Sequence, residues 1–135
     1  MSIMDQMESL EGAQAPEVVP ENEEYKIRII SVTADTNKNG DPYILPKFEV
    51  SDHPLAKDFT KYLQIPTKDL SQSDKKKFER TRWAMTEFFE CFGIDPQRPG
   101  DEESWVGREG WAILGVSEDE QYGEQNYVKK FIGSK

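Results

Sequence analysis

The side chains that most often carry catalysis are scarce in this sequence of 135 residues. It has one histidine, His53, between Asp52 and Pro54, and one cysteine, Cys91, next to Phe92. A single Cys and a single His cannot assemble a structural zinc site, and a cysteine among aromatic residues is typical of a small core side chain. The sequence has no glycine-rich phosphate loop, nucleophile elbow or metalloprotease helix. We therefore expect a protein that is not an enzyme and that uses no cofactor.

One segment resembles half of a calcium-binding loop. Asp35, Asn37 and Asn39 place oxygen atoms at positions 1, 3 and 5 of an EF-hand loop, and Gly40 follows at position 6. The bidentate glutamate required at position 12 falls on Pro46, which offers no ligand atom. The same residues suit a β-hairpin loop. We therefore expect a turn here and no metal site.

Basic and aromatic side chains alternate with apolar ones along the predicted strands. Cations that follow a phosphate backbone and flat rings on which bases stack are what a groove for single-stranded nucleic acid requires. The residues predicted to bind nucleic acid are Lys26, Arg28, Lys38, Tyr43, Lys47, Lys61, Tyr62, Tyr122, Tyr127, Lys129 and Lys130. Lys and Arg are also ordinary residues on the polar face of a strand, and Tyr packs well on strands. The residues alone therefore leave a protein-binding domain equally open.

These side chains must be positioned by strands, because their neighbours alternate between apolar and polar. The pattern predicts strands over residues 25–32, 43–50 and 59–65, a helix capped by Ser71 or Ser73 and ending at Gly93, and strands over residues 110–116 and 126–132. Pro46 lacks an N–H, so its strand must be an edge strand or bulged there. Trp83 should pack within the fold, and Trp105 and Trp111 should serve as core or loop anchors.

The order of three strands, one helix and two strands predicts a fold class. It is the order of a five-stranded OB-type barrel, in which the helix lies between strands three and four. An antiparallel sheet with one capping helix also fits, since closure cannot be derived from periodicity. We expect an all-β domain with one helix over residues 25–135.

The first 24 residues differ in composition from the rest. They hold seven acidic residues and no Lys or Arg, whereas the remaining 19 acidic and 17 basic residues leave the body near neutrality. They contain Gly12, Pro16 and Pro20 and no aromatic residue, which predicts a flexible acidic arm outside the core. Within the arm, one face of a short helix is apolar and would need a partner surface. The predicted partner-binding residues are Ile3, Met4, Met7 and Leu10, and the alternative is a frayed terminus.

The last third of the chain resembles a known hairpin. Residues 107–116 followed by residues 122–131, with the run Tyr-Gly-x-x-Asn-x-Val, are similar to the final hairpin of a family of small bacteriophage and prophage proteins. Those proteins resemble OB-fold single-stranded-DNA-binding proteins. The Lys38-Asn39-Gly40 turn and the helix end at Phe92-Gly93 agree in position, so the resemblance covers roughly residues 24–132.

The resemblance implies sequence-nonspecific binding of single-stranded DNA in phage replication or recombination. It also implies a phage or host replication or recombination protein as a partner of the acidic arm. One departure is that many single-strand-binding proteins carry their acidic tail at the C-terminus, whereas the acidic segment here is N-terminal. The alternative is a protein-interaction barrel that docks on a phage or host protein through the arm.

The sequence also indicates the cellular compartment in which the protein is expected. Its single cysteine allows no internal disulfide, which suits a reducing compartment. No apolar run approaches the roughly 20 residues that cross a bilayer, and residues 1–5 lack the basic and apolar regions of a secretory signal. We expect a cytoplasmic protein, in the host cytoplasm if a phage encodes it.

Overall fold

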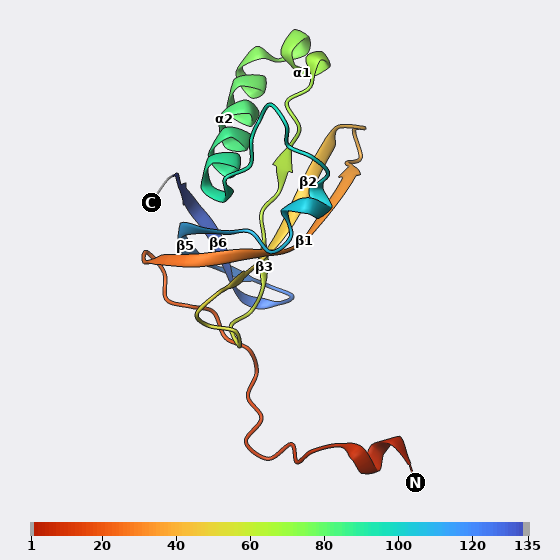
Figure 1. Cartoon of the computed structure of the whole chain (residues 1–135), viewed down its shortest axis with the longest axis vertical. Helices are drawn as coiled ribbons and strands as arrows, with labels where there is room; N and C mark the ends of the chain where they lie inside the picture. Colours follow the sequence, from red (N-terminus) through yellow and green to blue (C-terminus); the bar gives the residue numbers. More distant parts are fainter. Residues whose placement is uncertain (1, 134–135) are drawn as a thin grey trace.

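The computed structural model describes residues 2–133 and has a six-stranded antiparallel sheet as its main feature (Figure 1). The strands follow the order β3-β2-β1-β5-β6, and β4 pairs with β2 outside this path. Their bounds are β1 Glu24–Thr36, β2 Pro42–Val50, β3 Phe59–Thr60, β4 Leu63–Gln64, β5 Glu109–Asp119 and β6 Gly123–Ile132. The prediction of a mostly β fold with one main helix is confirmed.

The long strand β1 joins the two halves of the sheet. Ile27 and Arg28 each pair with β2 on one side and with β5 on the other. The register with β2 shifts between Ile29 and Ser31, which is a β-bulge, and a bulge bends a strand and increases its twist. A bent β1 can therefore serve two differently oriented halves of the sheet.

At Pro46 the strand β2 continues, and the segment that pairs with it is interrupted between β3 and β4. The strand β2 is central, because it pairs with β1 on one side and with β3 and β4 on the other, so the prediction of an edge strand or a bulge at Pro46 is wrong. The carbonyl of Pro46 accepts a hydrogen bond from the N–H of Lys61 at 3.2 Å, but proline has no N–H to return. The strand predicted over residues 59–65 is therefore divided into β3 and β4.

The sheet is open within residues 2–133. The strands β3 and β6 are in contact, but no hydrogen-bonded ladder joins these two outer strands. The predicted closure into a barrel is therefore not found. The ladders also extend beyond the predicted strand ends, for example over Thr33–Thr36, because backbone pairing continues after the apolar alternation ends at Val32.

Two helices follow β4. The short α1 (Lys68–Ser73) is capped by Thr67, whose hydroxyl accepts from the N–H of Leu70 at 3.2 Å. The long α2 (Lys75–Phe92) is capped by Asp74, whose carboxylate accepts from the N–H of Lys77 at 3.1 Å. The predicted caps Ser71 and Ser73 lie within α1 instead, because Asp74 breaks the helix in two.

The helix α2 covers one end of the core with aromatic side chains. Phe88 and Phe92 are buried against Phe48 of β2, and the rings of Phe48 and Phe92 stack with centroids 5.6 Å apart. Trp105, in the 3₁₀ turn η2 (Glu102–Trp105), is buried on Phe88 and donates its indole N–H to the carbonyl of Pro99 at 2.7 Å. It is a core anchor, as predicted. Trp83 is 63% exposed, so the prediction that it packs within the fold is wrong.

Residues 17–24 belong to the folded body. Val19 is buried in the core, and its N–H and C=O both bond the side-chain amide of Asn126, at 2.9 and 3.0 Å. The N–H of Asn22 donates to the carbonyl of Leu114, and the hydroxyl of Tyr25 lies 2.9 Å from the carbonyl of Pro20. The core therefore extends back to Val19, which the acidic, proline-containing composition of residues 1–24 did not predict.

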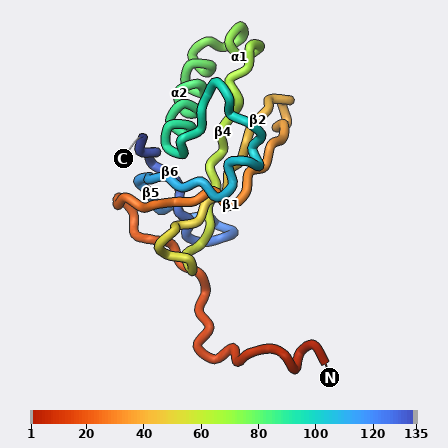
Figure 2. Tube along the Cα trace, in the orientation of Figure 1, coloured from red at the N-terminus to blue at the C-terminus, as the bar shows by residue number. Residues whose placement is uncertain are grey.

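The preceding residues leave the body as an extended chain (Figure 2). Residues 2–13, called the free arm below, make hydrogen bonds only with one another in the described chain. They contain a single 3₁₀ turn, η1 (Ile3–Gln6), rather than the predicted short helix. Met7 and Leu10 lie beyond that turn, so the four apolar residues do not share one helical face. No helix within residues 2–133 is long and apolar enough to cross a membrane.

Candidate nucleic-acid interface

Two tyrosines from neighbouring segments form an aromatic platform on the outer face of the sheet. Tyr43 lies on β2 and Tyr62 in the break before β4, and their ring centroids are 4.7 Å apart with the planes inclined by 31°. The next residues, Ile44 and Leu63, are buried, so the alternation of strand side chains turns both tyrosines outward. Tyr62 is 47% exposed. This tyrosine platform offers a flat surface on which a base can stack.

The turn between β1 and β2 holds the platform in place. The side-chain oxygen of Asn37 accepts hydrogen bonds from the N–H groups of Asn39 and Asp41, at 2.9 and 3.0 Å. Its amide nitrogen donates to the hydroxyl of Tyr62 at 3.2 Å. Asn37, one of the calcium-loop residues considered above, therefore orders the hairpin turn and orients a tyrosine. Sequence analysis did not identify this role, because Asn37 and Tyr62 are far apart in the chain.

Three of the predicted cations accompany the platform. Lys38 is exposed in the adjoining turn, and Lys61 is half-buried next to Tyr62. Lys47 is exposed on the same outward-facing side of β2 as Tyr43, four residues away. A strand rises about 3.3 Å per residue, so Lys47 lies about 13 Å along the strand from the platform. Tyr43 and Lys47 thus share the outward side of β2 next to Tyr62, and Lys38 and Lys61 adjoin the platform along the chain.

The turn between β5 and β6 borders the other end of this face. The ammonium group of Lys57 donates to the carbonyls of Tyr122 and Glu124, at 3.2 and 3.0 Å, which ties the turn to the segment before β3. Lys47 and Gln125 line a common hollow of about 470 Å³ with Lys57. Tyr122 is 65% exposed in the turn. The candidate interface therefore extends from the β1–β2 turn, across Lys47, to Tyr122.

Four predicted cations lie elsewhere or are already engaged. Arg28 forms an ion pair with Glu49, its cross-strand neighbour. The ammonium of Lys26 lies 6.0 Å from the ring centroid of Trp111 on β5, and Lys129 is hydrogen-bonded to the side chain of Asn22. The remaining residue, Lys130, is exposed opposite Ile113 on the β5–β6 hairpin. The structure therefore divides the predicted site between two regions of the surface.

Tyr127 lies on β6 opposite Gly115 of β5. A Cβ atom at Gly115 would lie only 2.4 Å from the tyrosine ring, so the glycine leaves the room that the ring occupies. The ring covers this glycine with one side and is 38% exposed. It provides a further stacking surface on the β5–β6 hairpin.

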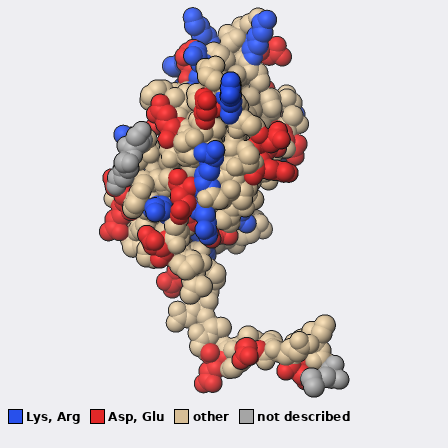
Figure 3. Space-filling view, in the orientation of Figure 1, with Lys and Arg blue, Asp and Glu red and all other residues tan. Residues whose placement is uncertain are grey.

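Charges of both signs are mixed on the face of the molecule that Figure 3 shows. Lys and Arg are interspersed with Asp and Glu over this face. The largest grouping of blue side chains in this view lies over the helices, away from the arm.

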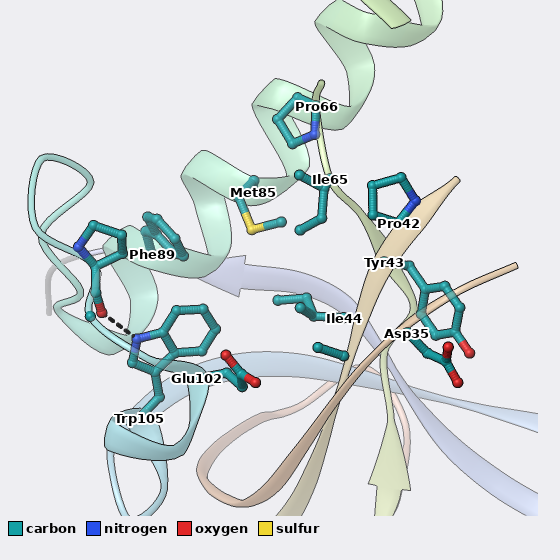
Figure 4. Close-up of a pocket in the computed structure, with 13 residues that line it drawn as sticks. Asp35, Pro42, Tyr43, Ile44, Ile65, Pro66, Met85, Phe89, Glu102 and Trp105 are labelled. Atoms are coloured by element: carbon teal, nitrogen blue, oxygen red, sulfur yellow. Dashed lines mark hydrogen bonds between the residues drawn. The ribbon is translucent and has the colours of Figure 1, made fainter. Parts of the chain in front are cut away.

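An apolar cavity of about 400 Å³ lies between the β1–β2 hairpin and the helices (Figure 4). Ile44, Met85 and Trp105 point into it, and the carboxylates of Asp35 and Glu102 lie among its lining side chains. Most of the lining side chains are apolar, and the two carboxylates repel a phosphate. The cavity is therefore a poor site for nucleic acid.

Two titratable groups, Cys91 and Tyr25, have raised pKa values. Burial raises the pKa of the Cys91 thiol to about 11, although the thiol also contacts the carbonyl of Trp111 at 3.3 Å. A protonated thiol is a poor nucleophile at neutral pH. Burial, and then the neighbouring Glu23, raise the pKa of Tyr25 to about 12. Within residues 2–133 no three Cys, His, Asp or Glu side chains are grouped so as to hold a metal ion.

The predicted partner-binding residues are all on the surface. Ile3, Met4, Met7 and Leu10 of the free arm are exposed. Neither a protein-family model nor a curated protein matches this chain.

Proposed function

We propose that this protein binds single-stranded DNA without sequence preference through the outer face of β2, β3 and β4. The observation that carries the proposal is the tyrosine platform, in which Asn37 bonds Tyr62, with Lys38 in the adjoining turn and Lys47 farther along the same side of β2. Every base has a flat face, so stacking on tyrosine tolerates any sequence. A role in phage replication or recombination is supported by the resemblance of residues 107–131 to the hairpin of phage proteins.

We propose in addition that the sheet is an OB-type barrel. Two features support this assignment: an OB-fold is itself only partly closed, and β3 contacts β6, the two outer strands that closure would join. In that fold the strands two and three, with the loops after strands one and four, bind oligonucleotides. The corresponding elements here are β2 to β4, the turn at residues 37–41 and the turn at residues 120–122.

The test is fluorescence anisotropy with a labelled oligo-dT, comparing the wild type with Tyr62→Ala and Tyr62→Phe. Loss of one base–ring stack should weaken binding by roughly 5- to 150-fold, which corresponds to about 1–3 kcal/mol. Tyr62→Phe is the matched control, because it keeps the ring and removes only the hydrogen bond from Asn37. It should bind within about threefold of the wild type.

The outcomes separate the proposal from its alternatives. Equal binding by Tyr62→Ala and the wild type would show that the platform is not the site. No binding by the wild type at micromolar protein would reject the single-strand function altogether. A mixed-sequence oligonucleotide should bind within a few-fold of oligo-dT, since stacking does not distinguish bases strongly.

A second candidate is a protein-interaction domain that docks through the free arm. The mixed surface charge (Figure 3) and the exposure of Ile3, Met4, Met7 and Leu10 favour it. If the wild type binds no oligonucleotide, and a variant lacking residues 2–13 loses a phage or host partner, this function replaces the first.

A further inference from the structure

The first half of α2 carries an exposed basic and aromatic surface. Lys75, Lys76, Arg80 and Trp83 surround an open hollow of about 690 Å³, together with Glu79. The name α2 patch is used below for Lys75, Lys76, Arg80 and Trp83, without Glu79. Trp83 is among the most exposed large apolar side chains of the body. Tryptophan and arginine are enriched among the residues that contribute most of the binding energy in protein interfaces.

The α2 patch is also positively charged. Residues 75–82 contain five cations and one carboxylate, Glu79. Glu79 pairs with Arg82 at 3.1 Å, and within residues 2–133 none of the three patch cations has an ion-pair partner. The patch thus combines unpaired positive charge with an apolar ring.

The free arm has the complementary composition. Its apolar residues Ile3, Met4, Met7 and Leu10 are exposed, and Asp5, Glu8 and Glu11 alternate with them. It has no Lys or Arg. An acidic segment with apolar anchors therefore occurs in the same molecule as a basic patch with an apolar anchor.

Met7 and Leu10 of the arm cannot reach the patch of their own chain, and Ile3 and Met4 could do so only with the whole segment fully extended. The body holds the chain at Val19, and the N-terminal segment leaves the body at the end opposite the helices (Figure 1). Met7 and Leu10 lie twelve and nine residues before Val19, so they extend at most about 43 and about 32 Å from it. A domain of about 100 residues has a diameter of about 34 Å, so the path halfway round it is about 50 Å. The patch of another copy is not restricted in this way.

We propose that the free arm of one copy docks on the α2 patch of a second copy. Arm and patch lie at opposite ends, so the contact is head-to-tail and leaves a free arm and a free patch at the two ends of every assembly. Such a heterologous contact produces open chains of copies rather than closed dimers. If the protein binds single-stranded DNA, this contact between copies would make the binding cooperative. Only this consequence rests on the proposed function.

Charge selects the α2 patch over the apolar cavity of Figure 4. The cavity of Figure 4 could accept an apolar side chain, but Asp35 and Glu102 at its lining would repel Asp5, Glu8 and Glu11. The three patch cations would attract them instead. Association should therefore weaken as the salt concentration rises.

The experiment measures the mass of the full-length protein by sedimentation velocity without DNA, from about 10 to about 300 µM at about 50 mM NaCl. Two variants reverse the charges on one side only: D5K/E8K/E11K in the arm and K75E/K76E/R80E in the patch. Both should fold, because the arm residues and Arg80 are exposed and glutamate is favourable at positions 75 and 76, in the first turn of α2. The control K68E/R98E/K130E reverses three exposed cations outside the patch.

The wild type and the control should grow in mass with concentration, and each reversed variant should associate at least about tenfold more weakly. An equimolar mixture of the two reversed variants should regain growth in mass, because the acidic arm of one fits the basic patch of the other, and the reversed arm fits the reversed patch. Combining both reversals in one chain should restore growth.

A wild type that remains monomeric, or a mixture that stays monomeric, would overturn the inference. So would a reversed variant that associates as strongly as the wild type. Because no DNA is present, failure of the single-strand function leaves this test unaffected. The cooperativity is then checked separately, by comparing oligo-dT of about 8 and about 60 nucleotides.

Discussion

Raising the NaCl concentration from about 50 to about 200 mM should weaken binding to a short oligo-dT about 18-fold. For a single strand, the logarithm of the affinity falls with the logarithm of salt with a slope of about −0.7 per neutralised phosphate. The structure leaves three predicted cations, Lys38, Lys47 and Lys61, available beside the tyrosine platform. Three contacts give a slope of about −2.1, and a fourfold change in salt then changes the affinity about 18-fold.

The same calculation gives a very different result for the site as predicted from sequence. Seven cations would give a slope of about −4.9 and a loss of about 900-fold over the same range. The structure removes four of them: Arg28 is paired with Glu49, Lys26 lies by Trp111, and Lys129 is bonded to Asn22. Lys130 lies on the β5–β6 hairpin.

The assay is anisotropy of a labelled oligo-dT of about eight nucleotides, short enough for one copy, at four or five salt concentrations. Lys47→Ala should reduce the slope by about 0.7, whereas Lys130→Ala, the matched control, should leave it unchanged. A wild-type slope near −5, or a change of slope in Lys130→Ala equal to that in Lys47→Ala, would refute the assignment of the face. A slope near zero would show that the phosphates are not contacted.

Three further predictions concern the stability of the fold. Asn126→Ala should lower the free energy of unfolding by about 2–4 kcal/mol in urea denaturation, since it removes the side-chain amide that bonds both the buried N–H and the C=O of Val19; an effect below about 0.5 kcal/mol would contradict the docking of residues 17–24. Gly110→Ala should cost about 1–3 kcal/mol, because its Cβ would lie 2.6 Å from the backbone oxygen of Cys91, and an unchanged midpoint would show that α2 and β5 are not so closely packed. Stability should fall as the pH rises from 9 to 12, because the folded protein keeps protons on Cys91 and Tyr25 that the unfolded chain releases at pH 9.0 and 10.0. Tyr25→Phe should make this fall shallower above pH 10, and an identical pH profile for Tyr25→Phe and the wild type would rule out this contribution.

The order of the elements could be predicted because it depends on local patterns. Alternation of apolar residues identified the strands, the change to a helical period identified α2, and Gly93, with φ of 66°, ends that helix as expected. The hairpin turn at residues 37–41 was also predictable, because Asn and Gly at those positions suit only a few backbone conformations. The end of β1 was less certain, because Thr33–Thr36 continue the ladder without burying side chains.

The candidate site was only partly predictable. Alternation correctly placed Tyr43 and Lys47 on the outer side of β2, because side-chain direction in a strand depends only on position. Tyr62 is exposed as well, although it lies in the break between β3 and β4. It could not show that Arg28 faces Glu49, because the register between two strands depends on residues far apart in the chain. Exposure of Trp83 was missed for a related reason: the helical period identifies an apolar residue but not the side that the sheet covers.

The sequence by itself determined the type and order of the elements and the acidic character of the first 24 residues. The tertiary structure alone decided which part of that acidic segment is folded: Val19 is held by Asn126, a partner more than a hundred positions away. It likewise decided which cations remain available and that the sheet is open between β3 and β6. The physical reason is common to all three. Backbone preferences and apolar periodicity act over a few residues, whereas pairing, burial and neutralisation of charge depend on which distant residues the fold brings into contact.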